Sequence, residues 1–322
     1  MVAQPQSTTA NRVLTEAQPS RPRHVLSIDL EDYFHVEAFS RDIDRSDWAQ
    51  YPARVTENTH RLLDLFDQYR VKATFFVLGW VANRFPRLIR EVHEREHELA
   101  CHSYWHRKIY ALTPAEFRED TRVARRAIED AASVSVSGYR APTWSVTQDS
   151  LWALDILAEE GFTYDSSIFP VHHDLYGIPG ASRYPWTYTS AGGKNLLELP
   201  PATIELLGTN LAAAGGGYFR ILPMCVTEWA FHRFEKESRS LVFYLHPWEI
   251  DPEQPRIAAS LKSKLRHYTN LATTQQRLEK MLQRYSFQPF RDYIRDRESE
   301  PSRYDQAHCQ RDAEPGSRFF CA

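Results

Sequence analysis

Short apolar runs and longer amphipathic stretches alternate along most of the chain. Residues 25–29 and 73–78 are continuous apolar runs that predict buried parallel strands, and further strands are predicted at 98–101, 134–139, 162–167, 196–200 and 241–245. Apolar residues recur at helical spacing in 54–69, 81–96, 113–131, 148–160, 223–236 and 258–285. The repeated order of strand and then helix predicts an α/β fold whose parallel sheet is a closed or nearly closed barrel.

The composition of the chain argues against several classes of function. The 322 residues carry a net charge of −3 with both signs interspersed, so no nucleic-acid partner is expected. Mean hydropathy is −0.53, and no apolar run approaches the about 18 residues of a membrane span. Residues 1–23 contain no apolar segment of a secretory signal, and the four cysteines show no C-x-x-C spacing. A cytoplasmic, reducing location is expected, and the oligomeric state is left open.

The two ends of the chain differ from its middle. Residues 1–22 are rich in Gln, Ser, Thr and Pro and predict a disordered leader. Residues 291–322 are polar and charged and predict a disordered tail. A single domain is therefore expected over 23–290.

Polar motifs follow the predicted strands. In β/α barrels catalytic groups lie at the carboxyl ends of strands, and this is where the sequence places the acidic run 29–32, His102, Arg140, Asp165 and His246. His102 and His106 stand four residues apart, so a helix starting after Cys101 would put both imidazoles on one face. Two neutral imidazoles with one carboxylate from 29–32 could bind a divalent metal.

A competing metal motif lies just upstream. Residues 93–97 read His-Glu-Arg-Glu-His, the zinc-protease helix signature. Charged residues surround this pair, and Ala100 and Ser103 stand where the longer protease motif needs Gly and His. We therefore interpret His93 and His97 as part of a solvated helix face.

Taken in order, five motifs resemble the polysaccharide deacetylases of the NodB-homology type, carbohydrate esterase family 4. They are Asp29-Leu-Glu-Asp32, His102-Ser-x-x-His106, Arg140-x-Pro142, Asp165-x-Ser167 and Leu245-His246. The resemblance covers about residues 24–250 and implies a distorted (β/α)7 barrel. The stretches 29–36 and 266–271 resemble the subgroup associated with exosortase and exopolysaccharide gene clusters, which implies that 258–290 is a C-terminal helical extension of the same domain.

The resemblance also implies a role for each motif residue. Asp29 would be the general base, held by Arg140, and His246 the general acid, oriented by Asp165. His102 and His106 would be metal ligands. The family's adjacent Asp pair is replaced here by Asp-Leu-Glu-Asp, so the third ligand is either Glu31 or Asp32. Strand alternation favours Glu31 and a turn at Leu30 favours Asp32; we prefer Asp32, whose shorter side chain loses less rotamer freedom.

The implied reaction is hydrolysis of an N-acetyl group on a hexosamine unit of a polysaccharide or lipid-linked oligosaccharide. The implied cofactor is a divalent metal, Zn²⁺ first, with Co²⁺ or Ni²⁺ as alternatives. Candidate substrate-binding residues are Tyr104, Trp105, Pro142, Trp144 and Trp248, and Tyr184 and Trp186 are further candidates for sugar stacking. Two other functions stay open: hydrolysis of a small amide on the same scaffold, and carbohydrate binding without catalysis.

Overall fold

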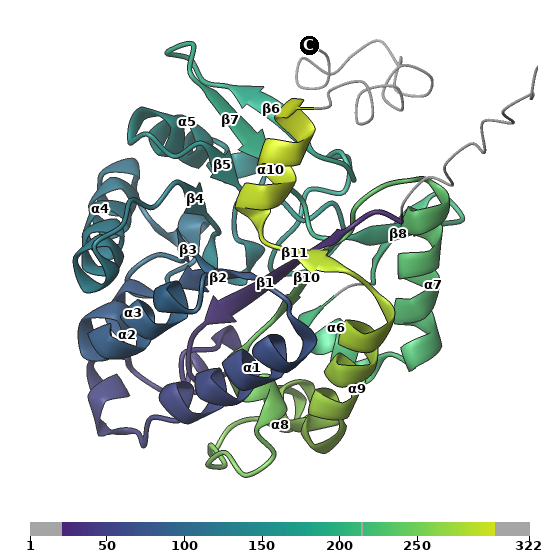
Figure 1. Cartoon of the computed structure of the whole chain (residues 1–322). Helices are drawn as coiled ribbons and strands as arrows, with labels where there is room; N and C mark the ends of the chain where they lie inside the picture. Colours follow the sequence, from purple (N-terminus) through teal and green to yellow (C-terminus); the bar gives the residue numbers. More distant parts are fainter. Residues whose placement is uncertain (1–20, 214, 300–322) are drawn as a thin grey trace, which may run out of the picture.

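The computed structural model describes residues 21–213 and 215–299 and contains one large curled sheet (Figure 1). Its path runs through β10 (Val242–Leu245), β1 (His24–Leu30), β2 (Thr74–Val77), β3 (Glu98–Cys101), β4 (Gly138–Tyr139), β5 (Tyr164–Asp165), β7 (Asn195–Glu198) and β6 (Trp186–Thr189), and β11 (Phe287–Gln288) pairs with β1. All pairs are parallel except β6 with β7. The predicted α/β class with a parallel sheet is confirmed.

The sheet is a curled half-barrel rather than a closed barrel. Its path ends at β10 on one side and β6 on the other, with no pairing between these two strands in the described part of the chain. After β5 the order of strand and helix is lost, because β6 and β7 form an antiparallel hairpin and β8 (Thr203–Leu206) and β9 (Thr209–Ala212) form a second, separate one. Without a helical crossover here, the predicted seven regular units do not form.

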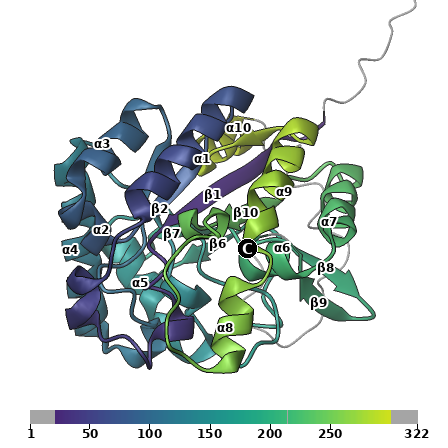
Figure 2. The same cartoon turned by 90° about the horizontal axis from the view of Figure 1, so that it is seen from below.

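Helices pack around the sheet in both views (Figures 1 and 2). They are α1 (Val55–Tyr69), α2 (Gly79–Arg84), α3 (Pro86–Glu94), α4 (Pro114–Ala132), α5 (Trp152–Glu159), α6 (Gly216–Ile221), α7 (Met224–Lys236), α8 (Leu261–Tyr268), α9 (Leu271–Arg284) and α10 (Phe290–Ser299). Two predicted helices are each divided. Pro86 begins α3 and separates it from α2, and Asn270, with φ of +59°, separates α8 from α9. No helix among the described residues is both long and apolar enough to cross a membrane.

Alternation along β1 sorts its side chains between the two faces of the sheet. Leu26, Ile28 and Leu30 belong to the main core beneath the helices, whereas Val25 belongs to a smaller apolar cluster that includes Phe290 of α10. Ser27 and Asp29, at the intervening positions, share the face of Val25. The inner face of the curl therefore changes from apolar to polar as β1 approaches its carboxyl end.

The helix α10 corrects the prediction of a disordered tail from residue 291. Phe290 stacks on Tyr164 with ring centroids 5.4 Å apart, and Tyr293 is buried in the same cluster. Figure 1 shows α10 in yellow between β6 and β11. The leader predicted at 1–22 and the tail beyond 299 lie almost entirely outside the described residues.

Candidate metal and catalytic site

Glu31, His102 and His106 form a buried cluster at the carboxyl edge of the sheet. One potential ligand atom from each residue lies within 4.8 Å of the others. Glu31 comes directly after β1, and both histidines follow β3. Because β1, β2 and β3 are adjacent and parallel, the ends of β1 and β3 lie at the same edge of the sheet.

The two histidines lie on a loop, not on the predicted helix. Residues 102–108 have no helical assignment, and Ser103 and His106 have φ of +65° and +50°. Asp120 of α4 holds this loop, since its Oδ2 accepts hydrogen bonds from Ser103 Oγ at 2.7 Å and from the Tyr104 backbone N at 2.8 Å. The imidazoles are thus brought together by a loop anchored to a neighbouring helix.

The geometry favours Glu31 over the preferred Asp32 as the carboxylate of this cluster. Asp32 Oδ2 accepts from the backbone N–H groups of Arg54 and Val55, at 2.7 and 2.9 Å, and its Oδ1 accepts from the Tyr33 N–H at 2.9 Å. Burial raises the pKa of Asp32 to about 6 despite these bonds. Asp32 therefore satisfies the first backbone donors of α1, while Glu31 keeps the strand alternation that places it with Asp29.

The donor atoms of the cluster fit a divalent metal. His102 Nδ1 lies 2.8 Å from the Arg140 carbonyl, which can only accept, so Nδ1 carries the proton and Nε2 keeps its lone pair. Burial lowers the pKa of His102 to about 4, so the ring is neutral at pH 7. Glu31 Oε2 faces His106 Nε2 at 3.0 Å yet has no hydrogen-bond partner among the described residues. Burial opposes ionisation of Glu31, but the charge of His106 brings its pKa far below the usual range.

Asp29 is held by Arg140, as the sequence predicts. Arg140 Nη1 donates to Asp29 Oδ1 at 2.6 Å and to Ser27 Oγ at 2.9 Å, and the Arg140 side chain is fully buried. The guanidinium also lies 3.9 Å from the ring centroid of Phe76. These contacts fix the carboxylate of Asp29 beside the Glu31–His102–His106 cluster.

His246 faces the same site from the end of β10. Its Nε2 is 3.8 Å from Asp29 Oδ2 and 3.6 Å from Glu31 Oε1. Its Nδ1 is 2.5 Å from Glu249 Oε1. Burial alone would lower the pKa of His246, but the hydrogen bond and charge of Glu249, with the charges of Glu31 and Asp29, raise it to about 9. The ring is therefore protonated at neutral pH.

Asp165 does not occupy the predicted place beside His246, because Glu249 does. Asp165 Oδ1 instead accepts from Ser167 Oγ at 2.5 Å, and Ser167 Oγ accepts from the Ala141 N–H at 2.8 Å. Asp165 thus supports the backbone that follows Arg140. Glu249 was missed by the sequence analysis, although its spacing of three residues after His246, with a proline at the first helical position, is a detectable capping pattern.

The predicted sugar-stacking residues differ in exposure. Trp248 is 5% exposed and stacks between His246 and His267, with ring centroids 5.2 and 4.2 Å apart. Trp144 and Pro142 are also buried, and Tyr104 is half-buried with its hydroxyl bound by Asn83. Trp105 is 37% exposed and is the candidate with most ring surface open to solvent. Tyr184 contacts Glu237 and Arg239, and Trp186 lies on β6.

The competing protease motif is not a metal site in this structure. The helix α3 ends at Glu94, and Glu96 has φ of +63°, so His93 and His97 do not share a helix face. His97 is also not solvated as predicted: it is fully buried, and its Nδ1 accepts from the Ala73 N–H at 3.1 Å.

The curled parallel sheet brings these groups together at its carboxyl edge. Residues 46–164 match the polysaccharide deacetylase family, and residues 166–295 match a domain of unknown function (DUF3473). The match supports a polysaccharide deacetylase domain over residues 46–164. His102, His106 and Arg140 lie in the first matched segment, and His246 and Glu249 lie in the second.

Curated relatives match part of the sequence, and solved structures match the fold. The chain is 41% identical over 95 residues to a chitooligosaccharide deacetylase from Bradyrhizobium sp. (strain ANU 289), a match that spans 29% of this chain and 43% of the relative. The fold is similar to that of a polysaccharide deacetylase from Mycobacterium smegmatis, with a TM-score of 0.58, 18% identity and coverage of 89% of this chain and 94% of the other. Puue allantoinase gives the same TM-score of 0.58 at 15% identity, covering 92% and 98%. Matches to these curated relatives span less than half of their length.

Proposed function

We propose that the protein is a divalent-metal-dependent N-deacetylase that hydrolyses the N-acetyl group of hexosamine units in a carbohydrate. The observation that carries the proposal is the convergence of three features at one edge of the sheet. These are the buried Glu31–His102–His106 cluster, the Asp29 carboxylate held by Arg140, and His246 with Nε2 3.8 Å from Asp29. Metal ligands, a base and an acid are the groups that metal-dependent amide hydrolysis uses.

Asp29 and His246 divide the proton transfers. Asp29 Oδ2, the oxygen that Arg140 Nη1 does not bind, takes a proton from the attacking water. His246, whose pKa of about 9 keeps it protonated at neutral pH, gives a proton from Nε2 to the amide nitrogen as the C–N bond breaks. The products are acetate and a free amine, so one proton is taken up by Asp29 and one is released by His246.

Glu31, His102 and His106 would hold the metal, and their two nitrogens and one oxygen suit Zn²⁺ first, with Co²⁺ or Ni²⁺ as alternatives. When bound, a divalent cation acts as a Lewis acid that polarises the acetyl carbonyl and makes water more acidic. Arg140 has a double role here, since its side chain fixes Asp29 and its carbonyl fixes the tautomer of His102.

The substrate class rests on relatives. One matching relative is described as a chitooligosaccharide deacetylase and another, from Helicobacter pylori, as a peptidoglycan deacetylase. We place the substrate in bacterial exopolysaccharide synthesis on the resemblance of residues 29–36 and 266–271 to that subgroup. A lipid-linked oligosaccharide is the form that a cytoplasmic enzyme would meet.

The test is acetate release from N-acetylglucosamine oligomers by the zinc-loaded protein, with allantoin as a small-amide comparator. Wild type should release acetate from the oligomers, Asp29→Asn should keep metal but lose turnover, and His102→Ala should lose both. Turnover of allantoin alone would replace the carbohydrate substrate with a small amide. Carbohydrate binding without hydrolysis of either substrate would overturn the enzymatic proposal.

A further inference from the structure

His246 and Glu249 form a hydrogen-bonded pair within one turn of chain. The short 3-10 helix Pro247–Ile250 folds Glu249 back, so that its Oε1 accepts from both His246 Nδ1 at 2.5 Å and the His246 backbone N at 3.2 Å. An ionised carboxylate can only accept, so the proton lies on Nδ1. With Nδ1 directed to Glu249, the opposite nitrogen, Nε2, faces Asp29 and Glu31.

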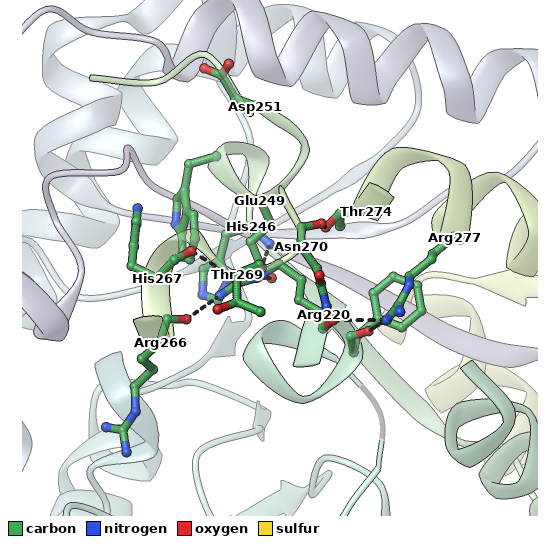
Figure 3. Close-up of polar contacts among 12 residues, drawn as sticks. Arg220, His246, Glu249, Asp251, Arg266, His267, Thr269, Asn270, Thr274 and Arg277 are labelled. Atoms are coloured by element: carbon green, nitrogen blue, oxygen red, sulfur yellow. Dashed lines mark hydrogen bonds and ion pairs between the residues drawn. The ribbon is translucent and has the colours of Figure 1, made fainter. Parts of the chain in front are cut away.

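Glu249 is itself fixed by Arg220 of α6 (Figure 3). Arg220 Nε donates to Glu249 Oε2 at 2.7 Å, and both side chains are buried. The two terminal nitrogens of Arg220 donate to three backbone carbonyls at the end of α8: those of Arg266 at 3.1 Å, His267 at 2.8 Å and Thr269 at 2.8 Å. A guanidinium with this many partners holds Glu249 in one position.

A second arginine, Arg277, stabilises the backbone of the helix that carries Arg220. Arg277 Nη1 of α9 donates to the carbonyls of Phe219, Arg220 and Leu222, at 2.7, 3.0 and 3.0 Å, and so satisfies the end of α6. Arg277 touches neither Glu249 nor His246 in these bonds. Two arginine networks therefore lie side by side: that of Arg220 is buried and contacts the partner of His246, and that of Arg277 is half-buried and does not.

We propose that Glu249, held by Arg220, is the positioning residue for His246, and that residues 216–269 complete the active site of the deacetylase domain. This inference rests on the proposed function. It assigns a function to part of the segment 166–295, which matches a domain of unknown function. Glu249 fixes the Nδ1–H tautomer and aims Nε2 at the leaving nitrogen, so that His246 can give up its Nε2 proton when the C–N bond breaks.

If the Glu249–His246 pair only stabilised the fold, its loss would affect activity differently from the loss of a pair that positions the acid. Loss of structure lowers all activities together, whereas loss of acid catalysis affects only leaving groups that need a proton. The amine of a hexosamine needs one. The 4-nitrophenolate released from 4-nitrophenyl acetate is a stable anion and does not.

The experiment compares Glu249→Gln, Arg220→Lys and the matched control Arg277→Lys on N-acetylglucosamine oligomers and on 4-nitrophenyl acetate, all zinc-loaded. Glu249→Gln should lower kcat on the amide by about 100-fold, with KM and zinc content little changed and the ester rate within about threefold. Arg220→Lys should also lower kcat on the amide, by about tenfold, because the single ammonium of a lysine cannot make all the hydrogen bonds of the planar guanidinium. Arg277→Lys should leave the ratio of amide to ester rates at the wild-type value.

An equal fall of both rates in Glu249→Gln would overturn the positioning role. A second measurement does not depend on activity: ¹⁵N-edited NMR of the histidine side chains should detect a slowly exchanging Nδ1–H of His246 in wild type and Arg277→Lys that disappears in Glu249→Gln. Persistence of that signal in Glu249→Gln would also reject the proposal. Wild type without amide or ester hydrolysis, but with the Nδ1–H signal lost in Glu249→Gln, would reject the proposed function and leave the pairing of Glu249 with His246 standing.

Discussion

Arg140 binds one oxygen of Asp29 and leaves the other directed at His246. Nη1 of Arg140 lies 2.6 Å from Asp29 Oδ1, while Asp29 Oδ2 lies 3.8 Å from His246 Nε2. One oxygen of the Asp29 carboxylate is thus bound by a fixed guanidinium, and the other faces His246. The orientation of Asp29 depends on that cation as much as on the backbone of β1.

Arg140→Lys should therefore lower kcat by about 100-fold, because a lysine cannot bond Asp29, Ser27 and Ser166 together as the guanidinium does. Zinc content should stay near one per chain. The control is Arg125→Lys, which also removes a guanidinium that bonds a carboxylate, that of Glu129, and lies over an aromatic ring. Acetate release and zinc content are measured on both, with thermal unfolding to confirm folding. A kcat within threefold of wild type for Arg140→Lys contradicts the role.

If Glu31 rather than Asp32 is the carboxylate ligand, variants of the two residues should differ in zinc binding and in stability. Glu31→Gln should weaken zinc binding by 100-fold or more, on the order of a lost ligand, and leave the unfolding temperature of the metal-free protein near wild type or higher. Asp32→Asn should bind zinc normally but lower stability by about 1 kcal/mol, because it weakens the acceptor of the Arg54 and Val55 N–H groups. Competition titration with a zinc chelator and thermal melts measure both quantities. Zinc loss in Asp32→Asn with zinc retained in Glu31→Gln would restore our original preference.

The sequence predicted several of the residues that lie together at the candidate site, but not all of their partners. The α/β class followed from the alternation of apolar runs and amphipathic stretches, and His102, His106, Asp29 and Arg140 do lie together. The helix predicted to align the two histidines is absent, because the loop is held by side-chain contacts to Asp120, which no local periodicity reports. The regular barrel of seven units was not predicted correctly for a similar reason, since the hairpins after β5 depend on strand pairing rather than on local sequence pattern.

Glu249 shows the same limit at the level of one contact. The family resemblance implied Asp165 as the partner of His246, and only the three-dimensional course of the chain after β10 places Glu249 there instead. The choice of Asp32 relied on side-chain length, yet the end of β1 at Leu30 carries strand alternation on to Glu31. Contacts between distant segments, such as Arg220 with Glu249, are not encoded in any short motif.

Asp165 and Glu198 predict a pH dependence of stability. Both side chains are fully buried. Burial raises the pKa of Asp165 to about 6, although its hydrogen bond with Glu198 opposes the rise. Burial and the charge of Asp165 raise the pKa of Glu198 well above its usual range. A carboxyl group with a raised pKa in the folded state contributes stability below the unfolded pKa, about 4, and loses it as the pH rises through the folded value. Wild type should therefore lose stability from Asp165 as the pH rises from about 4 to about 6, and the loss from Glu198 should continue at higher pH.

Glu198→Gln should remove much of that loss. The amide can keep the acceptor for the Ile168 N–H, which Glu198 Oε1 now provides at 2.9 Å, and can donate to an ionised Asp165. The metal-free variant should melt several degrees above wild type at pH 8 and close to it at pH 5, which thermal unfolding across this range measures. Glu205→Gln, at an exposed position on β8, is the control and should follow the wild-type curve. Parallel curves for Glu198→Gln and wild type would contradict the assignment of this pH-dependent loss of stability to the pair.

Asp120 should control metal affinity without being a ligand. Its Oδ2 accepts from Ser103 Oγ and the Tyr104 N–H, and its Oδ1 lies 3.4 Å from the Trp105 N–H. In Asp120→Asn one side of the group becomes an NH₂ donor, so whichever way the amide turns a backbone N–H of the loop loses its acceptor. The loop that carries His102 and His106 should then loosen, and zinc affinity should fall by about tenfold or more. Asp130→Asn, at an exposed position of the same helix, should bind zinc as wild type does. Unchanged affinity in Asp120→Asn, measured by the same chelator competition, would mean that the loop keeps its shape without this carboxylate.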